Sequence, residues 1–129
     1  MAKILLADDE EYIRELYTEE LSGEGHKISS VATGHNLLKR VGFFQPEVVV
    51  LDIRLMDYNG LELLQEIRKE YHDLPVILCT AYDTYKYDQK AIAADYYVVK
   101  SYDLSELKMA IERAVEAQNS LERTTRSLA

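Results

Sequence analysis

Short apolar runs alternate with helix-like segments along the chain, and this alternation constrains the fold more than any other feature. Five runs are rich in β-branched residues or leucine: Lys3–Ala7, Lys27–Val31, Glu47–Leu51, Pro75–Cys79 and Asp95–Val99. Most of the segments between them repeat apolar residues at spacings of three and four, as a helix with one buried face requires. Strand and helix therefore alternate five times, which predicts an α/β domain built on a parallel sheet.

The expected elements differ in how firmly they should pack. Val48 to Leu51 and Val76 to Leu78 are continuously apolar, as strands covered on both faces should be. The segment Tyr85–Ala94 should form the least firmly packed helix, because it is short and carries three charged residues. The 129 residues suit a single domain, which we place at residues 1–122. Residues 123–129 lack a helical stripe and are expected to be a frayed tail or the start of a linker.

Composition narrows the class of protein. The net charge is −8 and there is no basic stripe, which argues against direct binding of nucleic acid by this domain. No apolar run approaches the roughly 18 residues that a membrane span needs. The first apolar stretch is short and meets acidic residues at once, unlike a signal peptide. The single cysteine, Cys79, agrees with a reducing compartment, so a cytoplasmic location is the simplest expectation.

Charged and hydroxyl residues follow the ends of four expected strands. Asp8 and Asp9 follow the first strand, Asp52 the third, Thr80 the fourth and Lys100 the fifth. In a parallel sheet the carboxyl ends of the strands share one edge, and ligands bind there where the strand order reverses. With the order 2-1-3-4-5, that reversal lies between the two strands that carry the aspartates.

These residue types together point to phosphoryl transfer. Three carboxylates brought close together repel one another and call for a compensating cation. Mg²⁺ suits carboxylate oxygens, water and a phosphoryl oxygen, while Lys100 adds a positive charge and Thr80 a hydroxyl donor. Taken singly, each residue has a simpler interpretation, as a helix-capping acid, a capping threonine or a solvated lysine. Because these residues occur together at successive strand ends, a shared phosphoryl-transfer site is favoured over these separate roles.

The spacing of Asp8, Asp9, Asp52, Thr80 and Lys100 closely resembles the response-regulator receiver family of two-component signalling, over residues 3 to about 118. The resemblance implies a flavodoxin-like, doubly wound sheet with five flanking helices. It also implies that Asp52 accepts a phosphoryl group from a sensor histidine kinase, a phosphotransfer protein or acetyl phosphate.

The resemblance further implies a role for each site residue. Asp9 would bind Mg²⁺ directly, Asp8 through water, and Asp52 and the backbone carbonyl of Arg54 would complete the metal site. Lys100 and Thr80 would contact the phosphoryl group. Thr80 and Tyr97 would form the switch, with the tyrosine ring following the threonine inward. Arg54 and Tyr82 would modulate the phosphoryl lifetime; both are bulky, so we expect slow hydrolysis.

Such a module catalyses its own phosphorylation and dephosphorylation, so we do not expect an enzyme proper. Its output would be a downstream protein or a fused output domain, with no membrane partner, and homodimerisation is left open. Two other function classes remain: a receiver-like interaction module that acts without phosphorylation, and a phosphatase or nucleotide enzyme. The complete acidic set argues against the first, and the lack of a glycine-rich phosphate loop against the second.

Three positions depart from the family pattern, the mildest being Asn59 in place of the usual aspartate. Ser101 stands where the family normally has a proline after a cis bond, and Met56 replaces a common proline. A cis bond without proline costs about 2.5–4 kcal/mol. We nevertheless favour a cis Lys100–Ser101 bond, because Lys100 must still reach the site, and we expect a more mobile loop around Met56.

Overall fold

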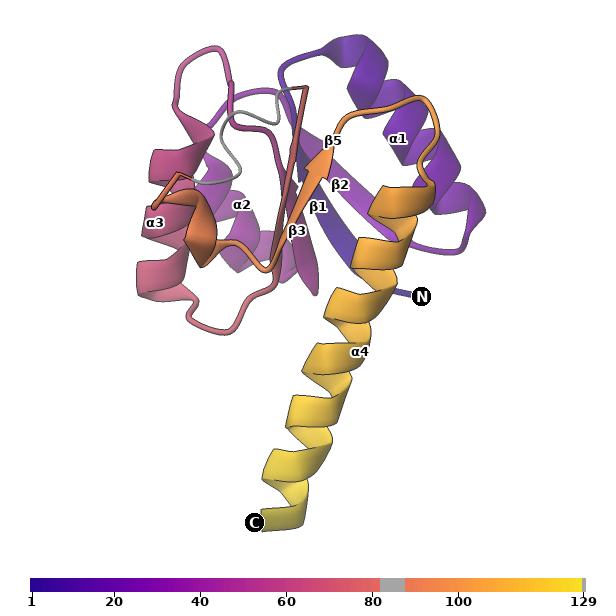
Figure 1. Ribbon diagram of the computed structural model, residues 1–129, viewed down its shortest axis with the longest axis vertical. Helices are drawn as coiled ribbons and strands as arrows, with labels where there is room; N and C mark the ends of the chain where they lie inside the picture. The colour runs from indigo at the N-terminus through magenta and orange to yellow at the C-terminus, as the bar shows by residue number, and fades with distance from the viewer. Residues whose placement is uncertain (82–87, 129) are drawn as a thin grey trace.

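The computed structural model describes residues 1–81 and 88–128, and these form one parallel sheet between two layers of helices (Figure 1). The elements follow in the order β1 (Lys3–Ala7), α1 (Glu11–Gly23), β2 (Lys27–Val31), α2 (Leu37–Phe44), β3 (Val48–Leu51), α3 (Gly60–Glu70), β4 (Val76–Thr80), a 3₁₀ helix η1 (Ala91–Ala93), β5 (Tyr96–Val99) and α4 (Ser105–Leu128). All strand pairs are parallel, in the order β2-β1-β3-β4-β5. The predicted fold class and strand order are confirmed.

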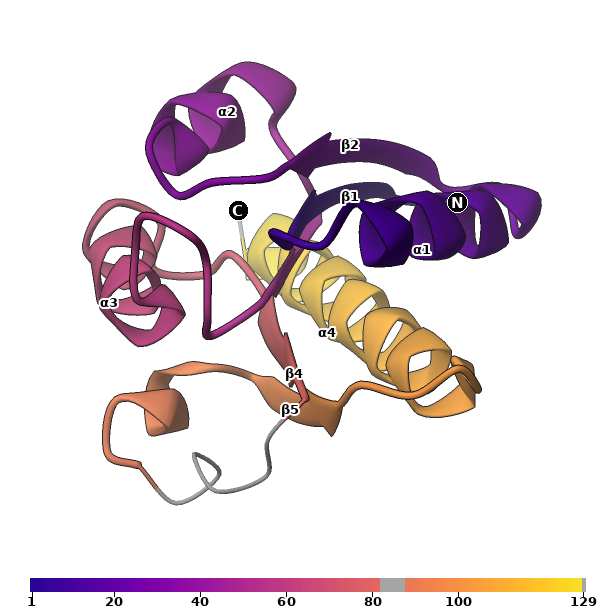
Figure 2. The same cartoon turned by 90° about the horizontal axis from the view of Figure 1, so that it is seen from above.

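The two faces of the sheet support separate apolar cores. Seen from above, α1 and α4 lie on one side of the sheet and α2 and α3 on the other (Figure 2). Alternate strand residues divide between them: Ile4 and Leu6 pack in the cluster under α1 and α4, whereas Leu5 and Ala7 pack in the cluster under α2 and α3. Every residue of β3 is fully buried, as its continuously apolar sequence predicts.

The start of α3 shows how local sequence determines an element boundary next to the sheet. The Asn59 side chain accepts a hydrogen bond of 2.8 Å from the Leu61 backbone N–H, which satisfies one of the free donors in the first turn. The backbone N–H of Gly60 donates to the carbonyl of Ile53 at 2.6 Å. A Cβ atom on Gly60 would lie 2.1 Å from the carbonyl oxygen of Asp52, so only glycine lets α3 approach β3 this closely.

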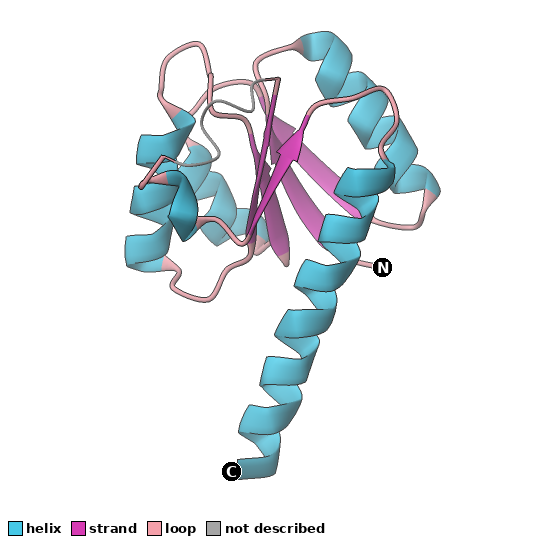
Figure 3. Cartoon of the chain, viewed as in Figure 1, coloured by secondary structure: helices cyan, strands magenta, loops and turns pink. Residues whose placement is uncertain are grey.

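The helices differ from the prediction in two places (Figure 3). Five helices were expected, but the described residues contain four α-helices. The expected helix Tyr85–Ala94 lies partly outside the described residues, and its described part holds only η1. The Asp88 side chain accepts a 2.8 Å bond from the Lys90 N–H, a local turn that competes with helix formation.

The last helix is longer than the sequence led us to expect. Residues 123–129 were expected to fray, whereas α4 continues to Leu128 and its C-terminal half extends beyond the sheet (Figure 1). Each added helical residue gains a backbone hydrogen bond once a helix is nucleated, so α4 can propagate without an apolar stripe. In the part of the chain that the structure describes, no helix combines the length and apolar character that crossing a membrane requires.

Candidate functional site

The carboxyl edge of the sheet carries four of the predicted site residues at or next to strand ends. Asp8 follows β1, Asp52 follows β3, Thr80 ends β4 and Lys100 follows β5. Backbone bonds extend the sheet into the site: the Asp52 N–H donates to the Ala7 carbonyl at 3.0 Å, and the Lys100 N–H to the Thr80 carbonyl at 2.7 Å. These bonds place the backbone of Asp52 and of Lys100 within one residue of a strand end.

The ammonium group of Lys100 bridges carboxylates from two strands. Its Nζ lies 2.8 Å from Oδ2 of Asp8 and 2.9 Å from Oδ2 of Asp52. A third carboxylate oxygen, Oε1 of Glu10, lies 3.3 Å away. Asp8 and Asp52 are only 2% and 5% exposed, so solvent screens their attraction to the Lys100 ammonium only weakly.

The buried charges alter each other's protonation. Burial raises the pKa of Asp52, an effect that the Lys100 ammonium partly offsets and the nearby Asp8 increases. Burial alone would lower the pKa of Lys100, but its hydrogen bonds to Asp8 and Asp52 outweigh burial and raise that pKa above the ordinary lysine value. Lys100 therefore stays positive at neutral pH, as the counter-charge to the aspartates.

A group of acids beside Lys100 offers oxygen ligands for a divalent cation. Among the described residues, Asp8, Asp9 and Glu10 each place a carboxylate oxygen within 4.8 Å of the other two. Hard oxygen donors of this kind fit Mg²⁺. Glu10 was not among the predicted ligands, although its position directly after Asp8 and Asp9 was a visible signal. Asp52 joins this group through the ammonium that it shares with Asp8.

The loop between β3 and α3 is held against the site by backbone bonds. The Arg54 N–H donates to Oδ1 of Asp52 at 3.3 Å, and Arg54 pairs with Asn59 in an isolated antiparallel bridge. Oδ1 of Asp57 accepts a 2.8 Å bond from the Gly34 N–H, which ties this loop to the one after β2. These bonds anchor the loop at both ends and at its tip, although Met56 stands in place of proline.

Comparison with known proteins decides the family. The sequence model of the response regulator receiver domain matches residues 4–112. The chain belongs to the receiver domain family. The receiver is 32% identical over 119 residues to the regulatory protein AtoC of Escherichia coli, covering 91% of this chain and 26% of AtoC. The chain thus spans about a quarter of the length of two curated relatives, AtoC and the regulator NtrC of Azospirillum brasilense.

Solved structures agree with the architecture of the receiver. The response regulator TrrA of Thermotoga maritima, in complex with Mg²⁺ and BeF, is 43% identical and superposes with a TM-score of 0.85, covering 88% of this chain and 99% of TrrA. TrrA in complex with the histidine kinase ThkA has a TM-score of 0.84 at 43% identity, covering 89% of this chain and 99% of the matched chain. Both matches cover almost all of the compared chain, so the similarity extends over the whole fold.

The bond after Lys100 corrects the expectation of a cis peptide in the receiver. The Lys100–Ser101 bond is trans, as are all peptide bonds of the described residues, and the Lys100 ammonium still reaches Asp8 and Asp52. The physical reason is the hydrogen bond from the Lys100 N–H to the Thr80 carbonyl, which continues the β5 ladder through Lys100. A trans bond is therefore compatible with the position of the Lys100 ammonium at the site.

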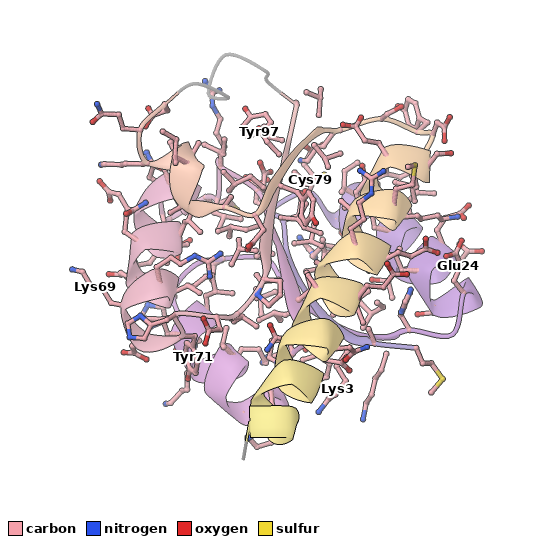
Figure 4. The ribbon with its side chains drawn as sticks, turned by 60° about the horizontal axis from the view of Figure 1, so that its bottom comes forward. Lys3, Glu24, Lys69, Tyr71, Cys79 and Tyr97 are labelled. Carbon is pink, nitrogen blue, oxygen red and sulfur yellow. The ribbon has the colours of Figure 1, made fainter. Side chains whose placement is uncertain are left out.

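The predicted switch residues lie on neighbouring strands of the receiver. Thr80 is fully buried at the end of β4. Tyr97 on β5 is partly buried and packs against the core under α2 and α3, whereas Tyr96 packs toward the core under α1 and α4. Figure 4 shows Tyr97 and Cys79 beside the carboxyl edge of the sheet, and the two belong to opposite cores. Tyr82, predicted to modulate the phosphoryl lifetime, lies outside the described residues.

Proposed function

We propose that this receiver accepts a phosphoryl group on Asp52 in a Mg²⁺-dependent reaction and changes conformation in response. One observation carries the proposal: the Lys100 ammonium holds Asp8 and Asp52, from strands on either side of the reversal in strand order, at 2.8 and 2.9 Å. A carboxylate nucleophile, a group of oxygen ligands and a fixed positive charge are the components of phosphoryl transfer by positioning and charge neutralisation.

In the proposed reaction a carboxylate oxygen of Asp52 attacks the phosphorus of a phosphohistidine or of acetyl phosphate. The new P–O bond forms as the P–N or P–O bond of the donor breaks, and imidazole or acetate leaves with the electron pair. Asp8, Asp9, Asp52 and the Arg54 carbonyl would hold Mg²⁺, and we add Glu10 to this set because its carboxylate joins Asp8 and Asp9. The bound cation supplies neutralisation of phosphoryl charge. Lys100 supplies further positive charge toward the phosphoryl oxygens.

The proposed switch begins at Thr80. Phosphorylation adds about −1.5 to −2 charge and three acceptor oxygens. Thr80 and Lys100 lie at the ends of the adjacent strands β4 and β5. Both would donate to the phosphoryl oxygens in only one conformation of the loops that follow these strands. Phosphorylation would therefore raise the population of that conformation. Tyr97 would follow Thr80 inward, because its strand pairs with β4 directly. Arg54 is exposed beside Asp52 and, with Tyr82, would slow the attack of water on the acyl phosphate.

The expected partners follow from this chemistry. A sensor histidine kinase or phosphotransfer protein would donate the phosphoryl group, as the complex of TrrA with ThkA suggests for that relative. The output would be a fused domain or a separate downstream protein, with a receiver domain over residues 1–122 and residues 123–129 leading out of it. We place the module in the cytoplasm and assign it no turnover of an external substrate.

Intact-protein mass after incubation with acetyl phosphate and Mg²⁺ tests the proposal. We expect wild type to gain one phosphoryl group, and Asp52→Asn or a chelator to abolish the gain. Asp73→Asn is a matched control, because it also removes one acid but lies before β4, at the opposite edge of the sheet. An unlabelled wild-type protein, or equal labelling of Asp52→Asn, would overturn the assignment.

A further inference from the structure

Tyr17 places a hydroxyl group in the core directly beneath the site. The residue lies within α1, is 1% exposed and belongs to the apolar cluster that includes Cys79 and Leu104. Its hydroxyl donates to the backbone carbonyl of Ser101, 84 residues further along the chain, at 3.3 Å. The hydroxyl also contacts the thiol of Cys79. One polar group of α1 therefore touches both β4 and the loop after β5.

Both contacted residues are sequence neighbours of site residues. Cys79 directly precedes Thr80, and Ser101 directly follows Lys100. Since β4 and β5 pair along their length, with Cys79 opposite Val98, the hydroxyl lies beside two adjacent strand ends. A displacement of the Ser101 carbonyl would be passed to the backbone of Lys100 through a single residue.

The Tyr17 hydroxyl stays protonated and can therefore act as a permanent hydrogen-bond donor. Burial raises the pKa of Tyr17 well above the ordinary tyrosine value, with a further contribution from Cys79. The hydroxyl therefore keeps its proton at neutral pH and can donate it. An unpaired hydroxyl in an apolar cluster is costly, so the folded chain retains the partner that it has.

Two further bonds of the loop join residues within it. The Ser101 hydroxyl accepts from the Asp103 N–H at 3.1 Å, and Oδ1 of Asp103 accepts from the Ser105 N–H at 2.9 Å. These bonds join residues two positions apart and shape the turn into α4, but they do not attach the turn to α1. With serine after Lys100, no proline ring restricts the backbone at this point. Among the described residues, the Tyr17 hydroxyl attaches the loop to α1, in addition to the backbone bond from the Lys100 N–H to the Thr80 carbonyl on β4.

We propose that Tyr17 is a positioning residue for Lys100: through the Ser101 carbonyl it holds the loop that aims the ammonium group at Asp8 and Asp52. The proposal rests on the function proposed above, because it assigns Lys100 a role in phosphoryl transfer. Tyr17 touches none of the reacting atoms, so it acts on the rate through the geometry of Lys100. The acidic group on the β1 side has its own supports, among them the 2.9 Å bond from the Glu10 N–H to Oδ1 of Asp8.

Tyr17→Phe removes the hydroxyl and keeps the ring. We expect the rate constant for phosphorylation by acetyl phosphate, at saturating Mg²⁺, to fall about three- to tenfold, the worth of one lost hydrogen bond. The Mg²⁺ dissociation constant, measured by calorimetry, should stay within about twofold of wild type. Tyr12→Phe is the matched control on the same helix, because Tyr12 is 60% exposed, and its rate should equal that of wild type.

Two further variants separate positioning from loss of stability. Ala110→Gly weakens α4 within the same cluster without touching the hydroxyl, so it should lower the melting temperature and leave the rate unchanged. In a Lys100→Met background, Tyr17→Phe should slow phosphorylation no further, because the two residues act as one unit.

Each other outcome overturns the proposal. Equal rates for Tyr17→Phe and a labelled wild type would refute it while leaving the proposed function intact. So would a matching loss of rate in Ala110→Gly, a parallel loss of Mg²⁺ affinity, or additive slowing in the Lys100→Met background. An unlabelled wild type would instead refute the proposed function and this role with it.

Discussion

Gly60 gives the sharpest test of how α3 supports the site. A Cβ atom at this position would lie 2.1 Å from the carbonyl oxygen of Asp52, 2.8 Å from Cα of Ile53 and 2.9 Å from the carbonyl carbon of Asp52. All three atoms belong to backbone that follows directly on β3. Backbone cannot rotate away as a flexible side chain can, so Gly60→Ala must displace either the start of α3 or the residue that carries the nucleophile.

The size of the effect follows from this contact. Overpacking typically costs about 1–3 kcal/mol, and a rigid neighbour places the cost at the upper end of that range. Alanine recovers up to about 1 kcal/mol of helix propensity. We therefore expect Gly60→Ala to lower the free energy of unfolding by about 2–3 kcal/mol, which for a domain of this size lowers the melting temperature by roughly 10 °C.

Urea unfolding followed by circular dichroism measures the loss, and phosphorylation by acetyl phosphate reports on the displaced Asp52. Gly23→Ala is the matched control, because Gly23 ends α1 and a Cβ atom there meets nothing within 4 Å. It should be neutral or stabilising by about 0.5–1 kcal/mol. A Gly60→Ala protein within about 0.5 kcal/mol of wild type, labelled at the wild-type rate, would refute the close-approach argument.

Three further outcomes are expected. Burial raises the pKa of Asp52, so ionisation of this carboxyl disfavours the folded state. The protonated carboxyl makes its full contribution to stability at low pH, and that contribution is lost as pH rises through the folded-state pKa. Without Mg²⁺, Asp52→Asn should therefore unfold at higher urea than wild type at pH 7, and the difference should disappear on acidification; equal midpoints at both pH values would contradict this. Arg68→Met removes the hydrogen bond to the Ala93 carbonyl at 2.8 Å and the ion pair with Asp95 at 2.6 Å. We therefore expect the free energy of unfolding, measured in urea, to fall by about 2–3 kcal/mol. A fall below about 0.5 kcal/mol would be inconsistent with these contacts. Cys79 is 3% exposed, and burial raises its pKa to about 12. Its reaction with a disulfide reagent at pH 8 should therefore be roughly a thousandfold slower than that of a free thiol, and should become fast in urea. Rapid reaction of the folded protein would disprove its burial.

The fold was predictable because its signals are local. The strand β3 could be recognised from four consecutive apolar residues, and its bounds differ by one residue from those expected. The segment Tyr85–Ala94 shows the limit of the same method. Helical spacing and a competing side-chain turn at Asp88 look alike in a sequence, and in the described part the turn prevailed.

The contact of Lys100 with Asp8 and Asp52 was predictable for a related reason. Asp8, Asp52, Thr80 and Lys100 each stand within one residue of a strand end, and parallel strands carry such positions to one edge whatever the details of packing. The order of the strands and of the charged residues along the chain was therefore enough to predict that Lys100 would lie close to Asp8 and Asp52.

Tertiary structure decided how they meet. That one ammonium serves both Asp8 and Asp52, and that the Lys100–Ser101 bond is trans, depends on the hydrogen bond between the ends of β4 and β5. The contact from Tyr17 to Ser101 spans 84 residues and has no counterpart in local spacing. Contacts between residues so far apart in the chain result from the packing of α1, α4 and the sheet as a whole. The residue types and the positions of the strand ends, by contrast, follow from the amino-acid sequence alone.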